Sequence, residues 1–260
     1  MMKDIPVEDA STDVPSRKEV WKMFDRIAHR YDFLNRSLSF GRDVAWRKRL
    51  RKHLPTDREL LVVDLATGTA DQILFLLEGP AKIREAKGYD LSEEMLSIGR
   101  EKIAQKGVGD VVSLHTGDAM KSPQADGTAD VITISFGIRN VEDVPTALAD
   151  MRRALVPGGK LLILECSLPP NRLMRRAYLL YFRHVLPKLG GLVSGDAYAY
   201  NYLNKTVETF PCGEAFCQLM RDAGFEDVAA EPMTFGVATL YSGVKPGVKP
   251  ELKSDGETAA

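Results

Sequence analysis

Segments with the character of β-strands and of α-helices alternate along the middle of the chain, and this alternation restricts the fold more than any other feature. The apolar run Leu60 to Ala66 has the length of a strand, and a helical pattern follows from Asp71 to Leu77. The run Lys160 to Ser167 is almost wholly apolar, as expected for a strand buried on both faces. The predicted strands are 60–66, a second ending at 88–90, 111–114, 130–135, 160–167, 225–231 and 235–243. We therefore predict an α/β, Rossmann-like fold with a mostly parallel, seven-stranded sheet and helices on both faces.

Helical segments before and within this pattern complete the predicted organisation. Residues 16–33 and 42–53 have helical spacing and precede the first strand. A long aromatic and basic segment at 168–210 interrupts the alternation, and proline and glycine become frequent from Lys245 onward. We expect a flexible arm at 1–15, one domain at 16–244 with a helical cap at 16–55 and a lid insertion at 168–210, and a disordered tail at 245–260.

Composition limits the classes of protein that this chain can belong to. With 260 residues, of which 44% are hydrophobic, it can bury the core of one α/β domain. Its net charge of −1 gives no chain-wide basic field, so we expect no nucleic-acid partner. The cysteines Cys166, Cys212 and Cys217 match no metal-ligand spacing and no disulfide framework, which predicts a reducing compartment and no metal. Because neither a signal peptide nor a membrane-spanning stretch is visible, we expect a cytoplasmic protein.

The turn that follows the first strand is the first sign of a ligand site. Asp64 lies near the end of the strand, and the small residues Thr67-Gly68-Thr69-Ala70 follow, which lets backbone amides approach a ligand closely. A dinucleotide-binding turn needs several glycines to admit pyrophosphate, whereas this turn has one, so a ligand without phosphates fits it better. Asp71 opens the next helix, where it either caps the helix or reaches the ligand.

Acidic residues also follow the second and third strands. Asp90 lies 26 residues after Asp64, where a carboxylate can accept both hydrogen bonds of a ribose diol; alternatively, it caps the next helix. Asp118 can accept from an adenine amino group and the Ala119 amide can pair with a ring nitrogen, although Asp118 taken alone is more typical of a turn. Positions of this kind at successive strand ends predict an adenosine site, because open α/β sheets bind ligands there.

Further segments of distinctive sequence flank these strand ends. They are Tyr31-Asp32-x-x-Asn35, Ser39-Phe40-Gly41, Trp46, Ser135-Phe136-Gly137-Ile138-Arg139-Asn140, Pro157-Gly158-Gly159-Lys160, Asp196-Ala197 and Tyr200-x-Tyr202. In this order they resemble the menaquinone and ubiquinone C-methyltransferases, the UbiE/MenG/COQ5 family, from about residue 20 to residue 243. The resemblance implies a class I S-adenosylmethionine-dependent methyltransferase that methylates a ring carbon of a polyprenylated quinol, and we favour demethylmenaquinol as that quinol.

The resemblance also assigns cofactor contacts. It places Thr69, Asp90, Asp118, Ala119 and Ser135 against S-adenosylmethionine, which leaves as S-adenosylhomocysteine, and to these we add Asp64, Gly68 and Asp71 from the first turn. This chain departs from the family in two places. Ala70 replaces a glycine, which is tolerable if its φ is negative, and Cys166 stands where the family usually has phenylalanine.

Other functions are compatible with parts of this pattern. One is methylation of 2-polyprenyl-6-methoxy-1,4-benzoquinol in the ubiquinone pathway, and another is methylation of a different small molecule, such as a phenol oxygen or a sterol. A third is a catalytically inactive protein that binds S-adenosylmethionine. The presence of Arg139 disfavours it, because such a protein would not need this residue. A nucleotide-dependent oxidoreductase is disfavoured because the glycines for pyrophosphate are missing.

Methylation of carbon needs a phenol that has lost its hydroxyl proton, so residues that favour a phenolate are the candidates for catalysis. Arg139 and Asn140 follow the fourth strand, and Arg139 would stabilise the developing charge, since a pKa above about 12 makes it a poor base. From the first helix, Tyr31 is a lid or stacking residue, and His29 is either a base or an exposed side chain. The predicted acceptor-site residues are Phe40, Phe136, His184, which is a second candidate base, and Tyr200.

The segment after the fifth strand is both apolar and basic. Leucine and aromatic residues at 173–182 alternate with Arg172, Arg175, Arg176 and Arg183. Such a segment can rest on an anionic membrane surface at the inner face of the cytoplasmic membrane, or it can be a lid helix with solvated arginines. The basic run at 42–52 is typical of a solvated helix face, and the sequence leaves a homodimer open.

Overall fold

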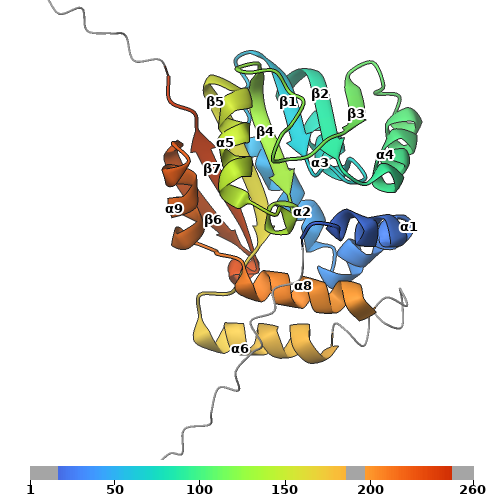
Figure 1. Cartoon of the computed structure of the whole chain (residues 1–260), viewed down its shortest axis with the longest axis vertical. Helices are drawn as coiled ribbons and strands as arrows, with labels where there is room; N and C mark the ends of the chain where they lie inside the picture. Colours follow the sequence, from blue (N-terminus) through green and yellow to red (C-terminus); the bar gives the residue numbers. More distant parts are fainter. Residues whose placement is uncertain (1–16, 186–196, 248–260) are drawn as a thin grey trace, which may run out of the picture.

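The computed structural model describes residues 17–185 and 197–247, and it contains a seven-stranded sheet (Figure 1). The strands are β1 (Glu59–Leu65), β2 (Lys82–Asp90), β3 (Val112–Thr116), β4 (Ala129–Ser135), β5 (Leu155–Cys166), β6 (Glu226–Met233) and β7 (Ala238–Val244). Their order is β3-β2-β1-β4-β5-β7-β6, and only β7 runs antiparallel to its neighbours. The predicted fold class is therefore confirmed.

Helices cover both faces of this sheet and one of its ends. They are α1 (Val20–Leu38), α2 (Arg42–Arg49), α3 (Asp71–Leu77), α4 (Glu93–Lys106), α5 (Val144–Ala154), α6 (Arg172–Leu180), α8 (Ala197–Thr209) and α9 (Glu214–Asp222). A π-helical turn, Tyr181–Val185, continues α6. In Figure 1, α1, α6 and α8 lie together at one end of the sheet, with α8 between α6 and the strands. Among the described helices, none is long and apolar enough to cross a membrane.

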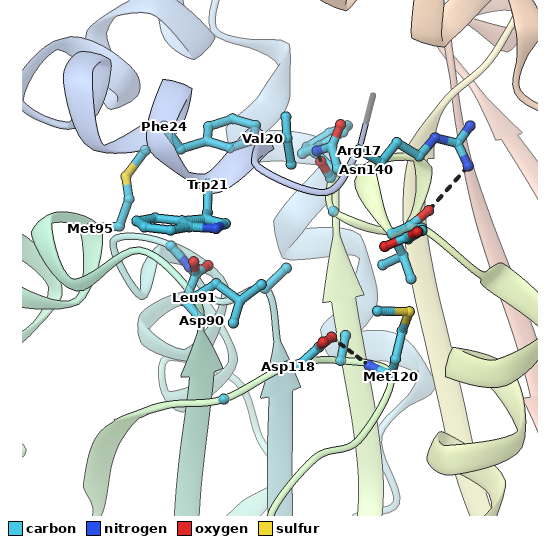
Figure 2. A pocket seen from close by; sticks show the side chains of 18 of the residues that line it. Arg17, Val20, Trp21, Phe24, Asp90, Leu91, Met95, Asp118, Met120 and Asn140 are labelled. Atoms are coloured by element: carbon cyan, nitrogen blue, oxygen red, sulfur yellow. Dashed lines mark hydrogen bonds between the residues drawn. The ribbon is translucent and has the colours of Figure 1, made fainter. Parts of the chain in front are cut away.

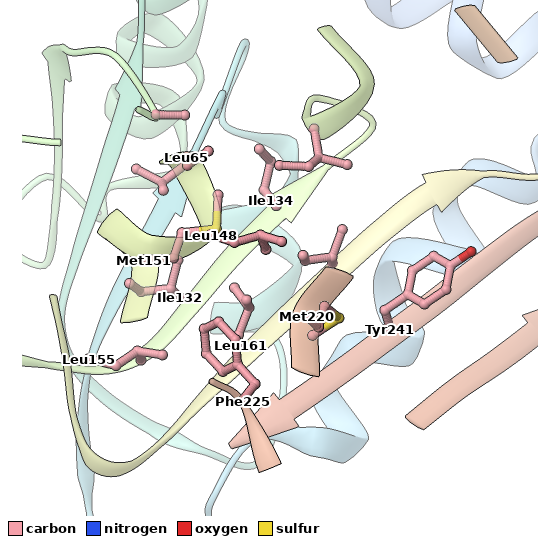
Figure 3. Close-up of a cluster of buried hydrophobic side chains, with 14 of the residues drawn as sticks. Leu65, Ile132, Ile134, Leu148, Met151, Leu155, Leu161, Met220, Phe225 and Tyr241 are labelled. Carbon is pink, nitrogen blue, oxygen red and sulfur yellow. The ribbon is translucent and has the colours of Figure 1, made fainter. Parts of the chain in front are cut away.

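Two apolar clusters hold the layers together. On one face, Leu148 and Met151 of α5 and Met220 of α9 pack with Ile132 and Leu161 of the sheet (Figure 3). On the other face, apolar side chains of α2, α3 and α4 pack against the opposite side of the same strands. Because the central strands contact apolar side chains on both faces, their sequences are continuous apolar runs rather than alternating ones.

Parallel pairing brings the carboxyl ends of β1, β2, β3 and β4 to one edge. In the register of the sheet, Asp64 of β1 lies beside Gly88 of β2 and Thr133 of β4, and Asp90 lies beside Thr116 of β3. The turns that leave these strands therefore meet, as the sequence predicted for a ligand site.

Several local expectations need correction. Ala70 has φ 63°, not the negative value that we expected, because the turn closes with a bond from its amide to the Thr67 carbonyl. A left-handed residue other than glycine costs about 1–2 kcal/mol. Ala70 also precedes α3 as its N-cap, so Asp71 does not cap this helix. The first helix runs to Leu38 rather than residue 33, and β5 begins at Leu155 rather than residue 160.

The predicted ends of the domain fall at the border of the described residues. The arm at 1–15 and most of the tail lie outside them. Lys245, where we placed the first residue of the tail, pairs through its amide with the Gly159 carbonyl, and its Nζ donates to the Leu155 carbonyl at 2.6 Å. Lys245 therefore bonds to the residues at the start of β5 and is held against the domain just after β7 ends.

Candidate active site

Two adjoining cavities open at the carboxyl ends of the parallel strands. The strand-tip cavity has a volume of about 180 Å³ and lies over the turns after β1, β2, β3 and β4, beneath α1 (Figure 2). The apolar cavity has a volume of about 310 Å³ and lies among α1, α2, the end of α6 and the turn between β6 and β7. Phe136 lines both cavities and so lies between them. A polar site is thus placed next to a site for an apolar group.

The Asp90 carboxylate is held in a fixed orientation at the edge of the strand-tip cavity. Its Oδ2 accepts from the Gly68 amide at 2.8 Å, and its Oδ1 accepts from the Ser92 amide at 2.9 Å. Ser92, not Asp90, caps α4, because its Oγ accepts from the Met95 amide. A carboxylate has about four acceptor positions, so capacity remains for a hydroxyl in the cavity. Desolvation raises the pKa of Asp90 from its ordinary value.

The other strand-end positions that we predicted also line this cavity. Gly68, Asp118, Ala119 and Ser135 all lie on its wall. Asp118 Oδ1 accepts from the Met120 amide at 2.9 Å, which fixes the turn after β3 (Figure 2). Four successive strand ends therefore converge on one space.

Helix α1 covers the strand-tip cavity with aromatic side chains. Trp21 projects from α1 toward Asp90, and Phe24 and Tyr31 stand edge to face with ring centroids 5.9 Å apart (Figure 2). Desolvation raises the pKa of Tyr31, so its phenol stays protonated at neutral pH and cannot act as a base. His29 is exposed and lines neither cavity, because it projects from the face of α1 opposite Ile27 and Ala28. This position speaks against His29 as a catalytic residue.

Close approach between two turns shapes the wall between the cavities. Ala66 and Phe136 both have left-handed backbones, with φ 47° and 62°. A Cβ on Gly137 would lie 2.6 Å from the Ala66 Cβ, so only glycine allows the two turns to touch. Phe136 is directed against α2, where its ring lies 6.2 Å from the Trp46 ring and 5.1 Å from the Arg47 guanidinium.

Three predicted cofactor residues lie behind the first turn and do not line the strand-tip cavity. Asp64 is buried and accepts from the hydroxyls of Thr67 and Thr133 at 2.7 and 2.5 Å. Thr69 donates to Asp32 at 2.7 Å. Asp71 pairs with Arg36 of α1 and Lys102 of α4. Their contact with the cofactor stays a prediction, and in the described structure they hold the turn in place.

A charge network that the sequence did not reveal fastens α1 to the domain. The Nζ of Lys102, on α4, lies 2.5 Å from Oδ2 of Asp32 on α1 and 2.6 Å from Oδ1 of Asp71 on α3. Arg36 of α1 contacts Asp71 at 3.3 Å and Asp43 of α2 at 2.6 Å. Helix α1, which covers the strand-tip cavity, is therefore tied to three other helices near the first turn.

Burial raises the pKa of Asp64 from 3.8 to about 6, which predicts a pH-dependent stability. The pKa of this carboxyl is higher in the folded than in the unfolded protein. Below the pKa of the unfolded state its stabilising contribution is complete, and it is lost as pH rises through the pKa of the folded state. Between pH 4 and pH 7, the unfolding free energy of the unmodified protein should therefore fall by up to about 3 kcal/mol relative to that of Asp64→Asn. Urea unfolding of both proteins across this range measures the effect. The exposed Asp110→Asn should follow the unmodified protein, and parallel curves for Asp64→Asn would contradict the assignment.

Arg139 is buried at the wall of the apolar cavity and paired with a buried carboxylate. Its Nη1 lies 2.6 Å from Glu165 Oε1 and donates to the Phe136 carbonyl at 2.7 Å. Burial is the largest single influence on the pKa of Arg139 and lowers it, but the charge and hydrogen bond of Glu165, together with Cys166 and Tyr31, raise the pKa overall. Among the described residues, Arg139 Nε has no hydrogen-bond partner. Arg139 is therefore a fixed cation at the wall of a cavity for an apolar group, and nothing in the linear sequence indicated Glu165 as its partner.

The remaining acceptor-site predictions divide into described and undescribed residues. Phe40 and Phe136 line the apolar cavity, together with Cys166, whose pKa desolvation raises to about 12. The side chains of His184 and Tyr200 lie outside the described residues. Asn140 lines the strand-tip cavity instead, where its Oδ1 accepts from the Tyr202 hydroxyl at 3.2 Å.

Solved structures share this architecture. An S-adenosylmethionine-dependent methyltransferase from Thermotoga maritima superposes with a TM-score of 0.60 and 23% identity over 86% of this chain and 99% of that chain. One from Aquifex aeolicus superposes with a TM-score of 0.52 and 16% identity over 76% of this chain and 88% of that chain. The fold, with its converging strand ends, is that of a class I S-adenosylmethionine-dependent methyltransferase.

Sequence comparison then identifies the family within this class. The chain belongs to the ubiE/COQ5 methyltransferase family, which matches residues 11–245. It is 42% identical to the demethylmenaquinone methyltransferase of Chlorobaculum parvum over 88% of this chain and 94% of that protein. It is 44% identical to the enzyme of that name from Thermus thermophilus, over 86% of this chain and 100% of that protein. A Geobacter sulfurreducens protein named ubiquinone/menaquinone biosynthesis C-methyltransferase UbiE is also 44% identical, over 86% of this chain and 87% of that protein.

The residues of the strand-tip cavity fit S-adenosylmethionine. Asp90 offers acceptor capacity for a sugar hydroxyl, and the single-glycine turn at Gly68 suits a ligand without phosphates. Trp21, Leu91 and Met95 give the cavity apolar surfaces of the kind that pack against a purine ring.

Proposed function

We propose that this chain transfers a methyl group from S-adenosylmethionine to a ring carbon of demethylmenaquinol, which yields menaquinol. The named relatives from Chlorobaculum and Thermus support this substrate. The single structural observation that carries the proposal is the arrangement of the two cavities: the strand-tip cavity and the larger apolar cavity share Phe136 as a wall. A polyprenylated quinol is the partner that such an arrangement would serve, because its ring must meet a polar cofactor while its prenyl chain needs an apolar surface.

S-adenosylmethionine supplies the methyl group in this reaction, and the protein positions the acceptor and its charge. The apolar cavity excludes water from the ring, with Trp46, Tyr178 and Phe182 among its walls. Exclusion of water strengthens each electrostatic interaction inside a site. Phe136 would hold the ring at the border of the two cavities, since it is fixed there by contacts with α2.

Arg139 is the residue to which we assign stabilisation of the phenolate. Its guanidinium is held by Glu165 at the wall of the cavity, where this cationic donor would stabilise negative charge on an oxygen of the ring. Such a preorganised donor is most effective where negative charge develops in the transition state. Because its pKa is raised, Arg139 does not accept the proton itself. His184 stays a candidate base from the sequence, and a water at the cavity mouth is the alternative.

A second candidate acceptor is 2-polyprenyl-6-methoxy-1,4-benzoquinol, because the name of the Geobacter relative covers both ubiquinone and menaquinone biosynthesis. The chemistry assigned to Arg139 applies equally to either quinol, because both expose a phenol beside the carbon to be methylated. The two acceptors differ in the width of their rings, so turnover must distinguish them.

The test is a turnover assay with short-chain demethylmenaquinol and with the short-chain benzoquinol, in which methylated product is detected by mass spectrometry. We expect the larger kcat/KM for the naphthoquinol. A larger value for the benzoquinol would move the protein to the ubiquinone pathway, and methylation of neither quinol would overturn the proposal. Calorimetric titration with S-adenosylhomocysteine and with NAD serves as the control, because an inactive binding protein would still bind the former.

A further inference from the structure

Large apolar side chains are exposed on three separate segments around the apolar cavity. Phe40, in the turn between α1 and α2, is 78% exposed, and Phe235, in the turn between β6 and β7, is 77% exposed. Leu173 and Leu180 of α6 are 77% and 61% exposed. We call these four side chains the apolar face. Single exposed apolar residues are ordinary, but a group of them beside a cavity marks an interaction site.

The three segments meet at the mouth of the cavity. The ring of Phe40 lies 6.1 Å from that of Tyr181, which directly follows α6, and both line the cavity. Thr234, beside Phe235, lines it as well. Gly236 packs so closely on Pro170, just before α6, that an added Cβ would lie 2.7 Å from the proline Cδ. The apolar face is therefore formed by neighbouring parts of the fold.

Both phenylalanines are held outward by unfavourable backbone conformations. Phe40 has φ 51°, and Thr234 and Phe235 have φ 47° and 59°. Left-handed φ values are rare for bulky residues and persist where surrounding contacts fix them, most often at functional sites. Here the Trp46 indole donates to the Thr234 hydroxyl at 2.8 Å and so ties the strained turn to α2. These exposed rings contribute nothing to the core, so the strain points to a function outside it.

Helix α6 presents an apolar stripe that no described element covers. Leu173, Ala177 and Leu180 are all exposed and follow i, i+4 and i+7 spacing, and α6 has no buried residue. Tyr181, four residues after Ala177 and so a neighbour of this stripe, lines the cavity. Figure 1 shows α6 at the edge of the molecule, with α8 between it and the sheet. The stripe therefore faces away from the domain.

The charges beside this stripe are positive. Helix α6 carries Arg172, Arg175 and Arg176 and no acidic residue, and Arg42 lies near Phe40 at the cavity mouth. In the described part of the chain, no carboxylate pairs with Arg42, Arg172 or Arg176. Two copies of such a face would repel each other, whereas the negative headgroups of an anionic bilayer would attract it. The charge thus favours a membrane over a homodimer.

We propose that the apolar face and the arginines of α6 dock the protein on an anionic lipid bilayer, with the mouth of the apolar cavity turned toward the lipid. The inference rests on the proposed function, because an acceptor with a prenyl chain resides in that lipid. Docking lets the quinol ring enter the cavity while its prenyl chain stays among the acyl chains. Phe40 and Phe235 enter the headgroup boundary as anchors, and the arginines contact the headgroups.

The experiment is flotation of the full chain with vesicles of phosphatidylglycerol and phosphatidylethanolamine, compared with vesicles of phosphatidylcholine alone. We expect binding to the anionic vesicles only, and a decrease of about tenfold or more for Arg172→Glu/Arg176→Glu. The matched control is Lys82→Glu/Arg84→Glu, which makes the same change of charge at the amino end of β2, far from the cavities. Binding that is equal for both double variants would overturn the proposal.

A second pair of variants tests the apolar anchors. Phe235→Ser should weaken flotation about fivefold or more, whereas Phe33→Ser, which removes a phenylalanine that is exposed on α1 and lines neither cavity, should not. Both should keep wild-type turnover of a short-chain quinol in detergent, and only Phe235→Ser should lose turnover of a long-chain quinol in vesicles. A change of molar mass in light scattering with unchanged flotation would show that the face binds a second copy instead. Flotation without turnover of any quinol would refute the proposed function and leave the docking intact.

Discussion

Arg139→Lys is expected to lower kcat about 100-fold or more and to leave the affinity for S-adenosylhomocysteine unchanged within about twofold. Lysine keeps a positive charge beside Glu165, so the buried carboxylate stays paired. It cannot reproduce the planar set of donors with which Arg139 contacts Glu165 and the Phe136 carbonyl at the wall of the apolar cavity. Turnover of short-chain demethylmenaquinol gives kcat, and calorimetric titration gives the cofactor affinity.

The matched control is Arg221→Lys, which changes an arginine that pairs with Glu214 on the exposed surface of α9, and it should have no effect on either quantity. Arg139→Ala should likewise reduce turnover far more than cofactor affinity, but it also leaves the buried Glu165 carboxylate without its cationic partner. That loss costs about 3–5 kcal/mol of stability, so thermal unfolding must accompany the assay. If a folded Arg139→Lys variant turns over at the wild-type rate, Arg139 has no part in the chemistry.

The parts of the site that the sequence predicts are those that follow from periodicity along the chain. The apolar run before Asp64 and the cap at Ser92 locate two strand ends, and parallel pairing then places Asp90, Asp118 and Ser135 at one edge of the sheet. Helical spacing could also have placed His29 on the outer face of α1, since Ile27 and Ala28 are the buried positions beside it.

Backbone conformation and partner choice could not be predicted in this way. Ala70, Phe136 and Phe40 take left-handed conformations that residue type disfavours, and only the contacts of the folded turns impose them. Glu165 and Lys102 pair with residues that are far away in the chain, and no local pattern marks such partners. These are the features that fix the cation in the apolar cavity and the cover over the strand-tip cavity.

Asp90→Asn is expected to weaken the binding of S-adenosylhomocysteine about 100-fold. The carboxylate is fixed by the Gly68 and Ser92 amides, and its remaining acceptor capacity faces the cavity. Loss of two charge-assisted hydrogen bonds to a ribose costs about 3 kcal/mol, which corresponds to the expected change in affinity. KM for the quinol at saturating cofactor should change little, because Asp90 does not line the apolar cavity. Asp110→Asn, in an exposed turn, is the control.

A cofactor analogue that lacks one ribose hydroxyl separates this contact from a general loss of structure. The unmodified protein should bind 2′-deoxy-S-adenosylhomocysteine about tenfold less tightly than the parent compound, since one charge-assisted hydrogen bond is missing. Asp90→Asn should bind the two compounds almost equally, because the partner of that hydroxyl has already been weakened. The two losses are then coupled, as expected for groups in direct contact. An equal penalty for the analogue in both proteins would show that Asp90 does not touch the ribose, and the orientation of the cofactor in the strand-tip cavity would have to be reversed.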